Sequence, residues 1–352
     1  MKLYDETKEI NWRIVFEKFL TKDLYDMVQD TQPYNKSLEM EYGAFNDEVL
    51  KKYFIYSASA INKSISKEDV CKEQFATNTN TFIERAREYK IGDPDGHSLL
   101  LQKLYNTLWG DLCSSYYMCE NAWISSDTMT SAQTLLNKAM KILDSEMKEI
   151  FNKVYKNNKR IYSRSSSVVL FSNDEKVDFC KLLGEKYSNM IKFLNRYHTI
   201  GNYCPVPINF NSARSGGVPK TGPDKYIGVV YDFWDLTLMK IREYYVATSI
   251  YERDRVIIEL LHGKGNSLYC KRWLDEFGTG LVGWKNFINI MLFQDYVDKD
   301  YNVKPFWDGH SWNNIAMVNT VEEIEKACEE INWRIEQRER RIKDKLQEIL
   351  KL

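Results

Sequence analysis

Residue types suited to acid–base and phosphate chemistry are concentrated between positions 198 and 235. An imidazole, whose unperturbed pKa is about 6.5, can act as a base or as a metal ligand. Carboxylates can orient that imidazole or hold a hard divalent metal, and guanidinium or ammonium groups can bind phosphate. The stretch therefore predicts a site for phosphodiester or phosphoryl chemistry, with a divalent metal as an open choice of cofactor. The candidate catalytic residues are His198, Asn202, Asp232 and Asp235, and the candidate substrate-binding residues are Asn211, Arg214, Lys220 and Lys225.

The same stretch contains a long irregular segment, residues 198–226. It holds four of the seven prolines of the chain, together with four glycines. Loops of more than about a dozen residues are uncommon inside compact proteins and are often functional. The next residues, 227–245, predict an amphipathic helix that carries Asp232 and Asp235 three positions apart on one surface. A structural interpretation also stays open, in which Arg214 pairs with one of these two carboxylates.

One motif in this stretch resembles part of a known enzyme family. The sequence H-T-I-G-N at 198–202, followed by F-N-S at 210–212, resembles the H-x-I-G-N … L-N-S stretch of HNH-type endonucleases in restriction enzymes that act on modified DNA. The resemblance implies cleavage of a phosphodiester bond. That family places its catalytic histidine in an H-x-x-P motif, whereas no histidine of this chain has a proline three positions later. The whole chain also resembles bacterial proteins of unknown activity that carry H-[ST]-I-G-N and D-[FY]-[FW]-D-L.

Two further functions are compatible with the sequence. Arg255, followed by six residues and His262, resembles the signature of HEPN-type ribonucleases, which are helical and cleave RNA without a metal; here Val256 replaces the usual polar residue after the arginine. A non-catalytic helical interaction or inhibitor protein is the other alternative, because the chain has 23 Tyr and 9 Trp and aromatic side chains dominate interface energies. Whether the chain is an enzyme stays open at this point. The expected partners are a nucleic acid or nucleotide, or another protein, and a role in phage–host conflict fits either.

The overall composition narrows these choices. Among 352 residues, 49 Lys and Arg balance 50 Asp and Glu, which excludes a general basic coat for nucleic acid and an acidic tail. There is no run of 18 apolar residues and no basic-then-apolar leader, so we expect no membrane partner and a cytoplasmic protein. The seven cysteines are odd in number and contain no C-x-x-C pair, which disfavours both a disulfide framework and a zinc knuckle.

The elements that must position these residues are predicted to be helices. Few Gly and Pro and many apolar residues at helical spacing favour a mainly α protein, a multi-helix globular bundle with one long Pro/Gly-rich loop at 198–226 and at most a minor sheet. Residues 156–167 are the best linker candidate, dividing the chain into regions 1–155 and 168–352, although one continuous domain is also compatible. The predicted helices span 10–27, 49–61, 70–89, 99–119, 129–154 (capped by 125–127), 174–197, 227–245 and 320–352, and a short strand is predicted at 168–171.

Three local features complete the predictions from the sequence. Thr320 and Glu323 form a capping-box pattern, and the apolar stripe that follows would suit a bundle or a homo-oligomer formed through the C-terminal helix. The hexapeptide E-I-N-W-R-I occurs twice, at 9–14 and 330–335. His310 stands in a polar D-G-H-S-W stretch, for which we predict an exposed turn rather than a ligand site.

Overall fold

The structure is a computed structural model, and the account below concerns the residues that it describes. These are 104–105, 107–109, 124–130, 135, 139, 161–164, 167–171, 176–178, 185–196, 200–207, 210, 213, 233–264, 267–313 and 318–351. The predicted helices at 10–27, 49–61 and 70–89 lie outside these residues. The division into regions 1–155 and 168–352 stays a prediction, because few described residues precede 161.

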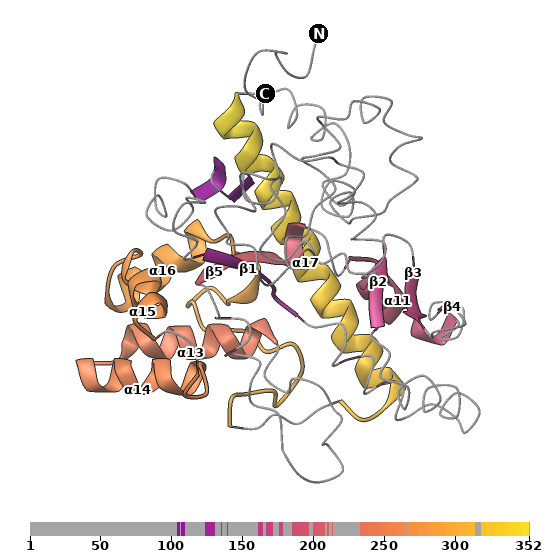
Figure 1. Ribbon diagram of the computed structural model, residues 1–352, viewed down its shortest axis with the longest axis horizontal. Helices are drawn as coiled ribbons and strands as arrows, with labels where there is room; N and C mark the ends of the chain where they lie inside the picture. The colour runs from indigo at the N-terminus through magenta and orange to yellow at the C-terminus, as the bar shows by residue number, and fades with distance from the viewer. Residues whose placement is uncertain are drawn as a thin grey trace, which may run out of the picture.

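The described part of the chain is mainly α-helical, as the sequence predicts. Figure 1 shows the last helix crossing the molecule between a group of helices on one side and a small sheet with a short helix on the other. Among these residues no helix is both long and apolar enough to cross a membrane. The helices are α11 (Ser188–Arg196), α13 (Trp234–Val246), α14 (Ile250–Leu260), α15 (Ser267–Asp275), α16 (Gly280–Ile290) and α17 (Val321–Leu350), with short 3-10 turns η3 (Glu185–Tyr187), η4 (Ile200–Asn202) and η5 (Gln294–Tyr296).

The strands form two small antiparallel sheets, which agrees with the minor sheet expected. β1 (Ile124–Thr128) pairs with β5 (Tyr203–Pro207), and β3 (Ser167–Phe171) lies between β2 (Ile161–Arg164) and β4 (Lys176–Asp178). The strand predicted at 168–171 is therefore confirmed. Pro205 and Pro207 fit into β5 because successive N–H groups along a strand point to opposite edges, so both missing donors fall on the same edge of a strand that has one partner among the described residues.

The long helix α17 confirms the prediction made for 320–352. Its N-cap Thr320 accepts a hydrogen bond from the backbone N–H of Glu323, whose side chain in turn accepts from the backbone N–H of Thr320. The 30 residues correspond to a length of about 45 Å at 1.5 Å per residue. The predicted apolar stripe is buried against α11 and η4 within the same chain, and its members are Ile324, Cys328, Ile331, Ile335, Ile342 and Leu346.

Three predicted helix boundaries differ from the structure. The segment 125–127 lies in strand β1 instead of capping a helix, because it pairs with 204–206 far along the chain. Within the helix expected from 174, residues 176–178 form strand β4, where Val177 pairs with Leu170 of β3, and α11 begins at Ser188. The helix expected from 227 begins at Trp234. The loop expected at 198–226 contains η4 and β5 in its first part.

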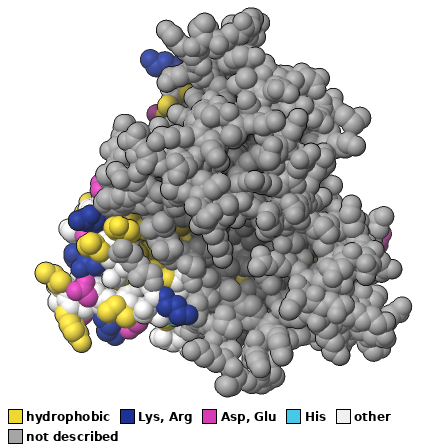
Figure 2. Space-filling model, in the orientation of Figure 1, with side chains coloured by type: hydrophobic (Ala, Val, Ile, Leu, Met, Phe, Trp, Pro, Cys, Tyr) yellow, Lys and Arg dark blue, Asp and Glu magenta, His cyan; other side chains and the backbone are white. Residues whose placement is uncertain are grey.

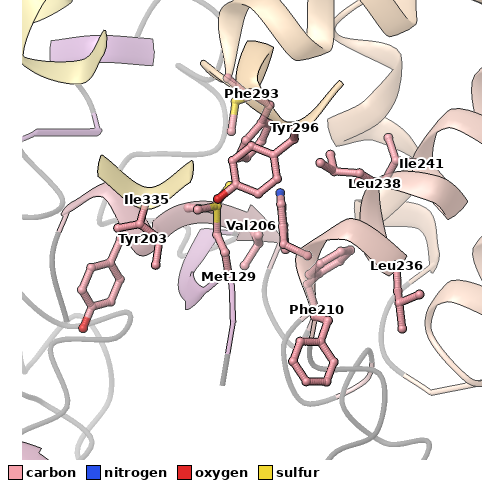
Figure 3. Packing of buried hydrophobic residues seen from close by; sticks show 14 of the residues in the cluster. Met129, Tyr203, Val206, Phe210, Leu236, Leu238, Ile241, Phe293, Tyr296 and Ile335 are labelled. Carbon is pink, nitrogen blue, oxygen red and sulfur yellow. The ribbon is translucent and has the colours of Figure 1, made fainter. Parts of the chain in front are cut away.

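Aromatic side chains from distant segments make up much of the core. Trp273, Trp284 and Phe287 pack between α13, α15 and α16, with ring centroids 5.4 Å (Trp273–Phe287) and 6.0 Å (Trp284–Phe287) apart. Figure 3 shows how Met129, Val206, Phe293, Tyr296 and Ile335 come together in the same apolar cluster. Because these residues belong to the ends of β1 and β5, to η5 and its flank and to α17, this cluster joins the helical layer to α17.

Two buried arginines on α17, one helical turn apart, fasten irregular segments to that helix. The guanidinium of Arg334 donates to the carbonyl oxygens of Lys304 and Pro305, at 2.7 and 2.9 Å, and pairs with Glu330 on its own helix. Arg338 donates to the carbonyl oxygens of Ile200, Gly201, Tyr203 and Met291, and its guanidinium lies 4.7 Å from the ring centroid of Phe293. Burial lowers the pKa of Arg338 from its ordinary value.

Candidate active site

A buried aspartate–histidine pair joins the start of α13 to the turn at 306–310. The Nδ1 atom of His310 lies 2.7 Å from Oδ2 of Asp235, and both side chains are fully buried. The same Oδ2 accepts a hydrogen bond from the backbone N–H of Phe306 at 2.8 Å, while Oδ1 accepts one from the N–H of Leu236 at 2.9 Å. Three donors therefore converge on one carboxylate, and this arrangement fixes the position of the imidazole.

The other side of the imidazole is held by aromatic rings. The ring of His310 stacks on Trp307, with centroids 3.8 Å apart, and meets the edge of Phe233 at 5.3 Å. Its Nε2 atom is buried and has no hydrogen-bond partner among the residues that the structure describes. When Nδ1 donates its proton to Asp235, a neutral imidazole presents Nε2 as a lone-pair acceptor. This is the arrangement in which a carboxylate orients a histidine for general-base chemistry.

Of the eight residues predicted from the sequence for the site, the structure describes Asn202 and Asp235. Asp235 contacts the 306–310 turn, as given above. Asn202 is buried at the end of η4. Its side-chain amide donates to the backbone carbonyl of Thr130 at 3.4 Å, and its backbone carbonyl accepts from the N–H of Met129 at 2.8 Å. The two residues thus serve different parts of the fold. The other six, His198, Asn211, Arg214, Lys220, Lys225 and Asp232, lie outside the described residues and stay predictions.

The partner of Asp235 is a residue that sequence reasoning placed on the surface. His310 was expected in an exposed turn because Asp308, Gly309 and Ser311 surround it, yet its exposure is 2%. The pairing with Asp235 spans 75 positions, so no local pattern reports it. The one local signal is the density of aromatic residues around it, at 306, 307 and 312, which is typical of a segment that packs inward.

The I-G-N part of the endonuclease-like motif is packed directly under α17. A Cβ atom at Gly201 would lie 2.2 Å from the carbonyl oxygen of Ile335, so only glycine permits this approach. The approach lets Arg338 reach the carbonyls of residues 200, 201 and 203. In the described residues, this part of the motif therefore serves to hold α17 against the start of β5.

The ribonuclease-like residues lie on and after α14. Arg255 is exposed and pairs with Glu243 and Glu259, at 3.5 and 3.6 Å. His262 adopts a φ of 51° in the turn that ends the helix and stacks on Trp312 at 5.5 Å. The buried ammonium of Lys240 bonds to the same two glutamates. Arg255 and His262 thus belong to one charged and aromatic cluster between α13 and α14.

A glycine-rich segment between α15 and α16 has the G-x-G-x-x-G spacing of dinucleotide-binding loops. In such loops the glycines follow a strand, whereas here they follow helix α15. Gly278 and Gly280 have φ of 99° and 61°, which turn the chain into α16, and a Cβ at Gly283 would meet the carbonyl of Gly278 at 2.6 Å. The glycines are therefore explained by a tight connection between two helices.

Among the described residues, no group of three His, Cys, Asp or Glu side chains is placed to hold a metal ion. Comparisons of the chain with protein-family models, with curated proteins and with solved structures find no match.

Proposed function

We propose that this protein is an enzyme that acts on a nucleic acid or a nucleotide, with Asp235 and His310 as its acid–base pair. The observation that carries the proposal is the geometry of this pair: a buried carboxylate with three donors, one of them Nδ1 of a histidine whose Nε2 has no partner in the described part of the chain. A carboxylate that orients a histidine in this way is typical of general-base catalysis.

The proposed chemistry uses His310 as the base. Its Nε2 takes a proton from water or from a hydroxyl group as that oxygen attacks phosphorus, and Asp235 stabilises the imidazolium that forms. The bond from phosphorus to the leaving oxygen breaks in the same displacement, and that oxygen takes up a proton from the imidazolium or from solvent, which returns His310 to its neutral form. The basic side chains predicted for substrate binding, Arg214, Lys220 and Lys225, would bind the phosphate. Because the ring of His310 is buried, substrate reaches Nε2 only when the residues that cover the ring move aside.

The test distinguishes the structural role of His310, which is its hydrogen bond to Asp235, from its proposed role as a base. In His310→Asn, the side-chain amide can keep the bond to Asp235 while the position of Nε2 is lost; in His310→Gln, an amide reaches the Nε2 position while the bond to Asp235 is lost. We expect His310→Asn to fold as the wild type does and to lose nuclease or nucleotide-hydrolysis activity by at least about 100-fold, the lower range for general acid–base catalysis. The panel is run with and without divalent metal, and His262→Asn is the matched control.

Two outcomes would contradict the proposal. One is a stable His310→Asn variant with wild-type activity, which would make the pair purely structural. The other is a wild-type protein inactive on every single-stranded, double-stranded and modified nucleic acid and every nucleotide in the panel.

A second candidate function, a protein-interaction module, is favoured by one specific surface. Apolar side chains are exposed at the end of the molecule formed by α14 and the start of α16, including Ile250 at 74%, Tyr251 at 80% and Val282 at 69%. Figure 2 shows apolar side chains interspersed with lysines and arginines over the coloured end of the molecule. Exposed apolar clusters of this kind mark interaction sites.

This second candidate is tested by assembly. If the surface binds another copy of the chain, the wild type sediments as a dimer or larger, whereas Ile250→Asp combined with Val282→Asp sediments as a monomer. The stripe of α17 that would suit a homo-oligomer is buried within the chain, so this helix would contribute only outward residues such as Trp333. A wild type that is monomeric at high concentration contradicts self-association.

A further inference from the structure

A groove with a volume of about 1070 Å³ runs along the first half of α17. One wall is the helix itself, a second is the 304–308 segment, and a third is the first turns of α11. The hexapeptide E-I-N-W-R-I of α17 faces both the core and the groove. Ile331 and Ile335 are buried in the core, whereas Asn332 and Trp333 line the groove. The volume matches the upper range of small-molecule sites.

Asn332 provides an unused acceptor in this groove. Its side chain is buried, and its amide nitrogen donates to the carbonyl of Asn189 at 2.9 Å. Its Oδ1 atom is buried without a hydrogen-bond partner in the described part of the chain. A buried acceptor without a donor is costly, so a ligand whose N–H group reaches Oδ1, once the side chains that cover this atom move aside, would be favoured.

Trp333, the next residue, provides a flat surface for a ring. It is 41% exposed, unlike most tryptophans that the structure describes, and the ammonium of Lys304 lies 5.3 Å from its ring centroid. Trp307 also lines the groove. An exposed indole beside an unused amide acceptor matches a planar heterocycle that stacks through its face and donates from its edge.

The charges of the groove exclude a polyanion as the best ligand. Three lysines and five carboxylates line it, but Glu323 caps α17, Glu330 binds Arg334 and Glu336 pairs with Arg196 and Arg340. The two remaining carboxylates, Asp308 and Glu329, are balanced by the two lysines Lys304 and Lys326. Ribose hydroxyls can donate to such carboxylates, and a lysine can bind one phosphate.

We infer that this groove binds the base and sugar of a nucleoside or mononucleotide, with the base stacked on Trp333 and an N–H of its edge donating to Oδ1 of Asn332. The inference deepens the proposed function and rests on it for the link to catalysis. That link is physical, because one segment borders both places: Phe306 and Trp307 line the groove, while the N–H of Phe306 bonds Asp235 and Trp307 stacks on His310.

The test is isothermal titration calorimetry with the four ribonucleosides and their 5′-monophosphates. We expect at least one of them to bind the wild type, and Trp333→Ala to weaken that binding about 10- to 100-fold, as loss of a base–aromatic stack does. Ile349→Ala is the matched control, since it removes an exposed apolar side chain of the same helix that does not line the groove. An analogue of the best ligand methylated at its edge N–H should bind at least about 10-fold more weakly.

The outcomes separate this inference from the proposed function. No binding by any of the eight compounds, or equal binding by wild type and Trp333→Ala, overturns the inference. If either result is found in a protein that cleaves nucleic acid in a way that depends on His310, the proposed function still holds. Binding that depends on Trp333 in a protein whose activity does not depend on His310 supports the groove and contradicts the catalytic pair. His310→Asn should bind nucleotide as the wild type does.

Discussion

Replacing Arg338 tests whether α17 stabilises the start of β5 through one buried guanidinium. The carbonyl oxygens of Tyr203, Gly201, Met291 and Ile200 lie 2.6, 3.1, 3.2 and 3.4 Å from its nitrogens. No carboxylate pairs with this guanidinium among the described residues. In Arg338→Met, the apolar stem is kept and these carbonyls lose their shared donor.

The expected loss follows from opposing contributions. Hydrogen bonds to a charged donor are worth about 1.5–3 kcal/mol each, but removing the guanidinium also relieves several kcal/mol of desolvation. The two shortest bonds together are worth about 3–6 kcal/mol, and subtracting about 2–3 kcal/mol of relieved desolvation leaves an expected net loss of about 1–3 kcal/mol in the free energy of unfolding. At about 2–4 °C for each kcal/mol, Tm falls by roughly 2–12 °C. Arg338→Lys should lose less, because an ammonium reaches fewer of these carbonyls.

The assay is urea and thermal unfolding followed by circular dichroism. Arg340→Met is the control: Arg340 is 63% exposed and pairs with Glu336 on the surface, so its loss should change stability by less than about 1 kcal/mol. An Arg338→Met variant as stable as this control would refute the reasoning, because it would mean that the carbonyls gain nothing from the guanidinium.

Three further outcomes follow from the packing. Gly201→Ala should lose about 3 kcal/mol, since its Cβ would lie 2.2 Å from a backbone oxygen, whereas Gly263→Ala, with φ of 67° and no atom within 4 Å, should lose only about 1–2 kcal/mol in urea unfolding. Ile331→Asp buries an unpaired carboxylate in the stripe of α17 and should lower stability by about 3 kcal/mol or more; unchanged melting would contradict the burial. Burial raises the pKa of the thiols of Cys270 and Cys328, so neither should react with iodoacetamide at about pH 8 until the protein unfolds, and mass spectrometry showing rapid labelling of the native protein would argue against that burial.

Local patterns predicted the elements that are determined locally. The start and the buried face of α17 could be read from Thr320, Glu323 and the spacing of isoleucines, because a capping box and a helical stripe involve residues three or four apart. The strand at 168–171 was predicted for a similar reason, since it is a short apolar run in a local meander.

Contacts between distant positions account for what the sequence did not reveal. Residues 125–127 have the composition of a helix cap, and only their pairing with 204–206 makes them a strand. Asp235 was singled out for its carboxylate, but its partner was expected elsewhere, because the bond to His310 joins segments 75 positions apart. The repeated hexapeptide does not reveal the position of Asn332 and Trp333, because the groove that they line is formed together with segments distant in the sequence.

The two buried arginines of α17 have a consequence for synthesis of the chain on the ribosome. Every carbonyl that Arg338 binds belongs to a segment made before α17, the earliest at residue 200. At about 5–20 residues per second, roughly 7–28 s separate the synthesis of residue 200 from that of residue 338. During that interval the carbonyl groups of residues 200, 201 and 203 lack the guanidinium of Arg338, and the start of β5 is not yet packed against α17. The nascent protein therefore completes this part of its core only after α17 has emerged, which makes the intermediate a natural substrate for chaperones.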